Sequence, residues 1–84
     1  MIETLVTEVA GIVRQAAKVP PYVMITADSR LVEDLAIDSL DLVGVLLGLQ
    51  DHFDIVIDDY VVPSLHRIVD LAEIVAKDRG LAAA

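Results

Sequence analysis

Residues 38–53 read DSLDLVGVLLGLQDHF, and their apolar residues recur at helical spacing. The pattern predicts a helix from about Ser39 to His52. At about 100° per residue the apolar side chains cover an arc of about 220°, whereas a stripe that only packs on a core needs roughly 100°. The part of the arc expected to pack on other helices holds Leu42, Val45, Leu46, Leu49 and Phe53.

The rest of this apolar arc lies beside Ser39. Leu40, Val43 and Leu47 follow the spacing i, i+3, i+7, which matches the anchors that an amphipathic helix offers to a partner. Periodicity alone leaves another interpretation equally open, in which the preceding loop or a short helix covers these side chains. The surplus apolar surface is therefore either a partner-binding strip or part of the interior.

Two glycines interrupt the same helix. Gly44 and Gly48 each cost about 1 kcal/mol relative to alanine inside a helix, so close approach by another backbone is one explanation for them. Their G-x-x-x-G spacing also occurs in membrane helices, but this segment is too short and its flanks are too acidic for a span. We place Gly48 on the solvent side of the helix, together with Asp41 and His52.

Helices are also expected on both sides of this stretch. Residues 2–17 place apolar side chains at spacings of three and four within about 120°, which predicts an amphipathic helix ended by Pro20-Pro21. A last helix begins near Leu65, and basic residues followed by glycine at residues 77–80 indicate its end. We expect residues 81–84 to fray.

The connections are a long loop and an acidic linker. Between the first two helices we expect an ordered loop with one short turn at residues 31–35, which Asp28-Ser29 could cap. Residues 54–59 form the linker, and a short helical turn at residues 59–62 precedes Pro63. The predicted fold class is all-α: a bundle of three main helices plus one short helix, with a long loop between the first two.

Size and composition fit a single domain spanning residues 1–84. Hydrophobic residues make up 56% of the chain, but only Tyr22, Phe53 and Tyr60 are aromatic, so the core must be mainly aliphatic. A chain of 84 residues leaves little room for an enclosed catalytic cleft. A binding or carrier role is therefore favoured over an enzyme.

Charge and cysteine content restrict the classes of binding partner and the cellular compartment that we expect. Six basic and fourteen acidic residues give a net charge of −8, which argues against nucleic acid and anionic membranes and favours basic protein surfaces. The chain has no cysteine, no signal-peptide pattern and no apolar run long enough to cross a bilayer. We expect a cytoplasmic monomer.

Ser39 is the candidate functional residue. A serine at a helix start is usually a cap whose oxygen accepts a backbone N–H. A hydrolytic nucleophile is disfavoured, because there is no G-x-S-x-G elbow and neither His52 nor His66 has triad spacing from it. The position also suits a phosphate ester, because free N–H groups and the helix dipole stabilise an added anion. Ser39 is thus a cap or an attachment point.

The context of Ser39 resembles the modification motif of acyl carrier proteins. The motif is LVEDLAIDSLDLV at residues 31–43, and the resemblance continues through Phe53 and residues 57–59 to residues 68–71. It implies an up-down helical bundle with 4′-phosphopantetheine, donated from coenzyme A by a phosphopantetheinyl transferase, on Ser39. Asp38 and Leu40 would flank the attachment point.

The same resemblance implies a carrier and not a catalyst. The prosthetic group would hold an acyl chain as a thioester for enzymes of lipid, fatty-acid or polyketide biosynthesis. Acyl-loading enzymes, synthases and acyltransferases would then dock through basic and apolar patches on the helix after Ser39. The residues expected to contact them are Leu40, Asp41, Val43, Gly44, Leu47, Gln50 and Asp51.

The chain departs from the family pattern at several positions. Gly44 and Gln50 stand where fatty-acid-synthesis members usually carry glutamates, so docking should depend less on salt and the pathway should be a specialised one. Ala36 replaces a common glycine, which should not prevent modification. At His66-Arg67 the family often has capping threonines; we expect a solvated His66 and a cap from Ser64.

Other classes of function rest on weaker patterns. A metal site built from Asp51, Asp54, Asp58 and Asp59 lacks the alternating ligands and central glycine of a calcium loop, so no metal is expected. The remaining alternatives are an aminoacyl or peptidyl carrier of a dedicated pathway, and an interaction adaptor with a carrier fold whose Ser39 is never modified.

Overall fold

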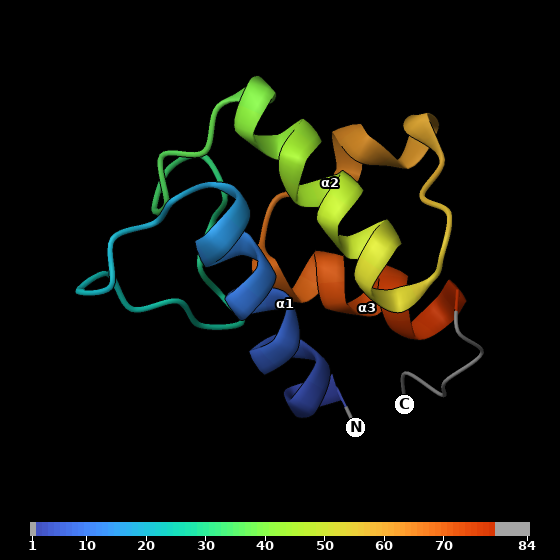
Figure 1. Ribbon diagram of the computed structural model, residues 1–84, viewed down its shortest axis with the longest axis horizontal. Coiled ribbons are helices and arrows are strands. Elements are labelled where there is room, and N and C mark those ends of the chain that lie inside the picture. Colours follow the sequence, from blue (N-terminus) through green and yellow to red (C-terminus); the bar gives the residue numbers. More distant parts are fainter. Residues whose placement is uncertain (1, 79–84) are drawn as a thin grey trace.

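The computed structural model describes residues 2–78 as a helical bundle (Figure 1). Its elements follow in the order α1 (Ile2–Ala16), α2 (Ser39–Phe53), the 3-10 helix η1 (Asp59–Ser64) and α3 (Ile68–Asp78). α1 packs against both α2 and α3. The predicted all-α fold, with a long loop between the first two helices, is confirmed. The predicted end signal at Gly80 and the fraying of residues 81–84 lie outside the described residues.

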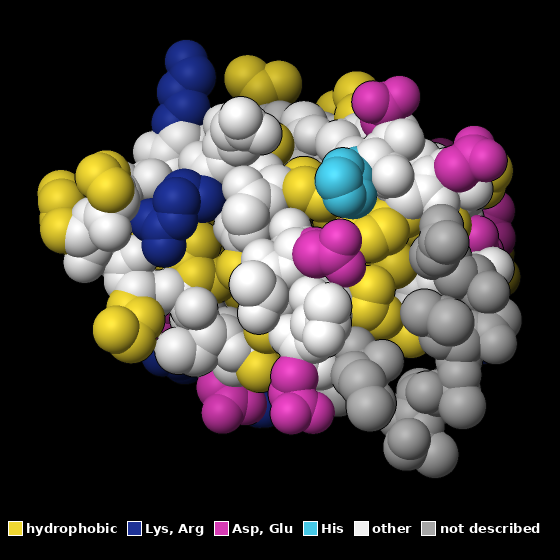
Figure 2. Space-filling view, turned by 60° about the horizontal axis from the view of Figure 1, so that its bottom comes forward, with side chains coloured by type: hydrophobic (Ala, Val, Ile, Leu, Met, Phe, Trp, Pro, Cys, Tyr) yellow, Lys and Arg dark blue, Asp and Glu magenta, His cyan; other side chains and the backbone are white. Residues whose placement is uncertain are grey.

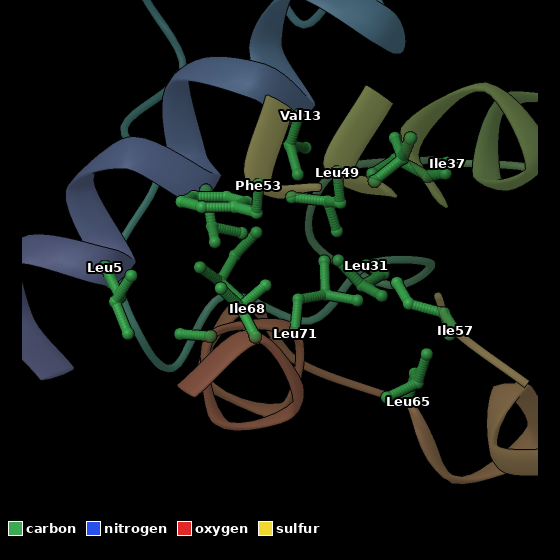
Figure 3. Packing of buried hydrophobic residues seen from close by; sticks show 14 of the residues in the cluster. Leu5, Val13, Leu31, Ile37, Leu49, Phe53, Ile57, Leu65, Ile68 and Leu71 are labelled. Atoms are coloured by element: carbon green, nitrogen blue, oxygen red, sulfur yellow. The ribbon is translucent and has the colours of Figure 1, made fainter. Parts of the chain in front are cut away.

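The core lies between the three α-helices and is aliphatic apart from Phe53 (Figure 3). Val45 and Leu49 of α2 are fully buried, and Leu42 and Leu46 pack against the same cluster, as their spacing predicts. Burying a side chain of this size stabilises the fold by about 1.5–3 kcal/mol. This packing fixes which face of α2 turns inward and which remains exposed.

The glycines of α2 lie against α1. A Cβ atom built on Gly48 would stand 3.1 Å from the Cγ2 atom of Ile12, so a larger residue there would require the Ile12 side chain to shift by a few tenths of an ångström. A Cβ on Gly44 would stand 3.9 Å from the Ala16 carbonyl oxygen, an ordinary contact. The placement of Gly48 on the solvent side was therefore wrong, because the helices approach closely along this line.

Both α1 and α2 end with a residue in the left-handed conformation. Lys18 has φ 54°, and the N–H of Val19 donates to the Arg14 carbonyl at 3.0 Å. Asp54 has φ 56°, and the N–H of Ile55 donates to the Gln50 carbonyl at 3.1 Å. These bonds satisfy carbonyls at the helix ends. α1 therefore ends before Pro20-Pro21, so the predicted terminator lies beyond the end of the helix.

The long loop is held on the start of α3 by backbone hydrogen bonds. Leu31 donates to His66 at 2.8 Å, and Ile68 donates back to Ser29 at 3.1 Å. Residues 31–35 form the predicted turn. The expected cap from Asp28-Ser29 is not made, because the Ser29 hydroxyl accepts the N–H of Thr26 instead. The N–H of Arg30 is bound by the Asp34 carboxylate within the turn.

α3 begins three residues later than predicted. Ser64 belongs to η1, where its hydroxyl donates to the Val61 carbonyl at 2.6 Å, so the expected Ser64 cap was wrong. The Asp70 carboxylate does the capping, because it accepts the N–H groups of His66 and Arg67, each at 2.9 Å. α3 is thus capped by a carboxylate in its own first turn and not by the serine that precedes it.

Candidate functional site

Asp38 is the cap of α2. Its backbone is extended, with φ −86° and ψ 179°, and its Oδ1 atom accepts the N–H of Asp41 at 2.8 Å. Its carbonyl accepts the first intrahelical bond, from Leu42 at 2.9 Å. The expectation that Ser39 caps the helix is therefore corrected. The sequence signal for this cap is the aspartate directly before the periodic segment.

Ser39 is consequently the first residue of α2 and is exposed. Within residues 2–78, its hydroxyl has no hydrogen-bond partner, and the N–H groups of Ser39 and Leu40 are also unpaired. Unpaired donors at the positive end of a helix dipole stabilise a nearby phosphate. The hydroxyl is thus free to form a phosphate ester, and the residues around it fit such a group.

The backbone before Ser39 is anchored in the core. Ile37 is 2% exposed, and its N–H donates to the Leu31 carbonyl at 2.9 Å. Ala36 turns the chain with φ 55°, a conformation that costs a non-glycine residue about 1–2 kcal/mol. This explains why glycine is common at the position in the family that the sequence resembles. The buried isoleucine fixes where α2 starts and so where the serine stands.

The turn ahead of this anchor carries an ion pair. The Arg30 guanidinium donates to the Asp34 carboxylate, with 3.2 Å between Nη2 and Oδ1. These side-chain hydrogen bonds, and then the one from the Arg30 N–H, lower the pKa of Asp34. Both side chains are exposed, so the pair contributes little to stability.

An exposed strip, defined as Leu40, Val43 and Leu47, runs along α2 from Ser39. The three residues are 79%, 53% and 62% exposed. Of the two interpretations left open by periodicity, the structure therefore selects the uncovered surface. Exposed apolar residues that line up on one helix face are typical of interaction sites. Asp51 lies one helical turn beyond Leu47 and is also exposed.

A shallow groove of about 140 Å³ separates this strip from η1. Val43, Leu46, Leu47 and Gln50 line it on one side, and Ile57, Asp59 and Val62 on the other.

Gln50 also ties the two sides of this groove together. Its Nε2 atom donates to the Leu46 carbonyl at 3.2 Å, and its Oε1 atom accepts the Ile57 N–H at 3.0 Å. The amide therefore has an internal role that the sequence did not indicate.

The remaining candidate residues do not form a second site. His52 stacks edge-on against Phe53 and lies 3.9 Å from the Glu8 carboxylate, while His66 is exposed as expected. Across residues 2–78, no three His, Asp or Glu side chains gather in a way that could hold a metal ion. In the same part of the chain, no helix is long and apolar enough to cross a membrane.

The bundle and its free helix-terminal hydroxyl are compatible with a carrier-type protein, and the comparisons with known proteins show the family. The sequence model of the phosphopantetheine attachment site family matches residues 7–75. The chain is 34% identical over 56 residues to an acyl carrier protein of Akkermansia muciniphila, covering 67% of this chain and 70% of that protein. An acyl carrier protein of Syntrophobacter fumaroxidans is 34% identical over 57 residues, covering 68% of this chain and 70% of its own.

A plant protein is also similar. The chloroplastic acyl carrier protein 1 of Hordeum vulgare is 33% identical over 72 residues, which cover 86% of this chain and 48% of the barley protein. The chain belongs to the acyl carrier protein family. Phosphopantetheine is the cofactor of this family, and a carrier function follows for the chain.

Proposed function

We propose that this protein carries acyl groups on 4′-phosphopantetheine attached to Ser39. The observation that carries the proposal is the exposed Ser39 hydroxyl, which has no hydrogen-bond partner within the described residues while Asp38 caps the helix. In the transfer, Ser39 Oγ forms a bond to phosphorus as the pyrophosphate bond of coenzyme A breaks, and adenosine 3′,5′-bisphosphate and the Oγ proton leave. The group supplies a terminal thiol that holds the acyl chain as a thioester.

This protein's own residues position and present the attachment point. Asp38 caps the start of α2 without engaging the Ser39 hydroxyl, and the buried Ile37 anchors this helix start in the core. Asp38 and Leu40 flank the group, and the unpaired N–H groups of Ser39 and Leu40 would face its phosphate. On this proposal the chain holds and orients its cargo while other enzymes, in the cytoplasm, do the catalysis.

Modification is tested by intact-mass spectrometry after incubation with coenzyme A and a promiscuous phosphopantetheinyl transferase. The wild type should gain one phosphopantetheinyl mass and Ser39→Ala should gain none. Ser64→Ala is the matched control, because Ser64 is also exposed near a helix junction, and it should be modified like the wild type. An unmodified wild type would favour the adaptor that is never modified, and a mass gain that persists in Ser39→Ala would reject attachment at Ser39.

We also propose that synthases, acyl-loading enzymes and acyltransferases dock on the exposed strip and its edge. Leu40, Val43 and Leu47 supply apolar contact, and the carboxylates of Asp41 and Asp51 meet basic side chains. Three of the expected contacts, Asp41, Gly44 and Gln50, are only partly exposed, so the expected full exposure of Asp41 was wrong; Gly44 faces α1 and the Gln50 amide is bound internally. Apolar contact should therefore dominate, as in a specialised lipid, polyketide or aminoacyl pathway.

A titration against a standard ketoacyl synthase tests the specialised role. Exposed ion pairs contribute about 0–1 kcal/mol each and are screened by salt, so docking that depends on them weakens as salt rises. We expect poor turnover by the standard enzyme, and a loss of turnover by the cognate enzyme in Leu47→Ser that exceeds the loss in Asp51→Asn. Normal, salt-sensitive turnover by the standard enzyme would assign the chain to housekeeping fatty-acid synthesis.

A further inference from the structure

The turn between α1 and the long loop presents two large apolar side chains to solvent. Tyr22 is 86% exposed and Met24 is 81% exposed. The turn stands at one end of the longest axis of the molecule, at the left of Figure 1, and hydrophobic atoms gather beside basic ones at the same end in Figure 2. We call residues 18–24 the basic turn. Neither the core nor the exposed strip uses these side chains.

The basic turn is held in a defined shape. The Arg14 guanidinium donates to the Pro20 carbonyl at 2.6 Å and to the Val23 carbonyl at 2.8 Å. Val19, 6% exposed, fixes the start of the turn in the core. A surface that is ordered before binding loses less conformational entropy when it binds. The backbone that carries Tyr22 and Met24 is thus held in place, and both side-chain types are enriched at interfaces.

Charge around the basic turn is opposite to that of the whole protein. Residues 14–24 hold two basic side chains, Arg14 and Lys18, and no acidic one, while the whole chain has a net charge of −8. Lys18 lies in the turn itself and is exposed. The surface that would complement the turn is therefore apolar with carboxylates at its edge.

The exposed strip of α2 has this chemistry. Its three aliphatic side chains are bordered by the exposed carboxylates of Asp51 and Asp59, and Asp59 lines the groove next to Leu47. The strip runs along α2, whereas the basic turn stands apart from α2 at the left of Figure 1. Two copies can bring the two surfaces together in a head-to-tail contact, in which a patch on one copy meets a different patch on the other.

We propose that the basic turn docks on the exposed strip of a second copy of this chain. Tyr22 and Met24 then contact Leu40, Val43 and Leu47, and Lys18 faces Asp51 and Asp59. The net charge of each copy opposes association, so the contact is weak and the dilute protein is monomeric. When formed, the contact covers the helix face next to Ser39 and competes with other proteins for it.

Sedimentation equilibrium of the unmodified full chain tests the proposal independently of any prosthetic group. The weight-average mass should rise between about 10 μM and about 1 mM, a range that corresponds to weak binding. Tyr22→Ser/Met24→Ser and Val43→Ser/Leu47→Ser should each weaken association by about tenfold or more, as the loss of central apolar contacts does. A wild type that stays monomeric at the highest concentration overturns the proposal.

Mixing the two double variants distinguishes a head-to-tail contact from a symmetric one. Each variant retains one intact patch, so an equimolar mixture should form a one-to-one complex although neither variant associates alone. This result also shows that both variants are folded. A mixture that remains monomeric while the wild type associates overturns the head-to-tail contact.

Charge reversal supplies a matched pair of variants. Lys18→Glu should weaken association several-fold, because it places a carboxylate against Asp51 and Asp59, whereas Lys77→Glu, which changes the net charge equally but lies on α3, should weaken it much less. Equal losses in both variants would overturn the proposal by assigning the effect to net charge. So would sedimentation of the wild type with vesicles of anionic phospholipid in the absence of self-association, because the turn would then be a membrane contact.

Discussion

Backbone N–H groups at the starts of α2 and α3 need a hydrogen-bond acceptor, and the two helices supply it from different positions. Both helices follow a buried anchor, Ile37 or Leu65, and both have a serine nearby. At α2 the preceding Asp38 binds a backbone N–H and leaves Ser39 without a partner among the described residues. At α3 the cap comes from within the helix, and the nearby serine hydroxyl is bound to a carbonyl. A carboxylate caps the helix in both cases, so the two serines differ because the Val61 carbonyl accepts the Ser64 hydroxyl, whereas no acceptor among the described residues binds that of Ser39.

The largest expected effect distinguishes the two serines. Ser39→Ala should lose phosphopantetheinylation completely while its free energy of unfolding changes by less than about 0.5 kcal/mol, because an exposed hydroxyl without a partner is removed. Ser64→Ala should keep full modification but lose about 1 kcal/mol of stability with its hydrogen bond to Val61. Urea denaturation alongside intact-mass spectrometry measures both. A destabilised Ser39→Ala would mean that this hydroxyl also has a structural role.

The next effect compares the two capping carboxylates. Asp70→Ala leaves two N–H groups without their acceptor and should cost about 1–2 kcal/mol, whereas Asp38→Ala leaves one and should cost about 1 kcal/mol. Asp58→Ala is the control, because Asp58 precedes η1 without making a side-chain cap, and it should be nearly neutral. Thermal or urea unfolding gives the order. Equal costs for all three variants would contradict these capping roles.

A smaller effect, which raises stability, is expected from a substitution just before α2. Ala36→Gly should stabilise the protein by about 0.5–1 kcal/mol, because glycine adopts the positive φ of this position without strain. Ala10→Gly, inside α1, should destabilise it by a similar amount. The two urea midpoints should therefore move in opposite directions. A loss of stability in Ala36→Gly would show that backbone strain at this turn is not the controlling factor.

The smallest effect depends on pH. The folded-state pKa of Asp34 lies below its ordinary value of 3.8, so its contribution is complete well above 3.8 and is lost as the pH falls through the lowered folded-state value. Asp34→Asn removes this contribution. The small difference in unfolding midpoint between wild type and variant should therefore shrink between about pH 7 and about pH 3. A difference that is constant with pH would contradict the pairing with Arg30.

Local patterns in the sequence were sufficient for the helices and for the candidate serine. The apolar spacing around Val45 and Leu49 specifies both a helix and its buried face, because each turn of a helix repeats the same side. The motif around Ser39 indicated a carrier, and the family comparison agrees. Spacing could not decide whether Leu40, Val43 and Leu47 are covered, because that depends on where the distant η1 and the loop lie.

Tertiary structure decided the details that depend on contacts between distant segments. Gly48 was placed on the wrong side because only the path of α1 shows that Ile12 approaches it. α3 starts late because the Leu31 N–H in the loop donates to the His66 carbonyl. This hydrogen bond holds His66 outside the helix. The sequence by itself thus determined the elements and the attachment candidate, since both are encoded locally. The exposed surface was decided only by packing, because exposure is a property of the whole fold.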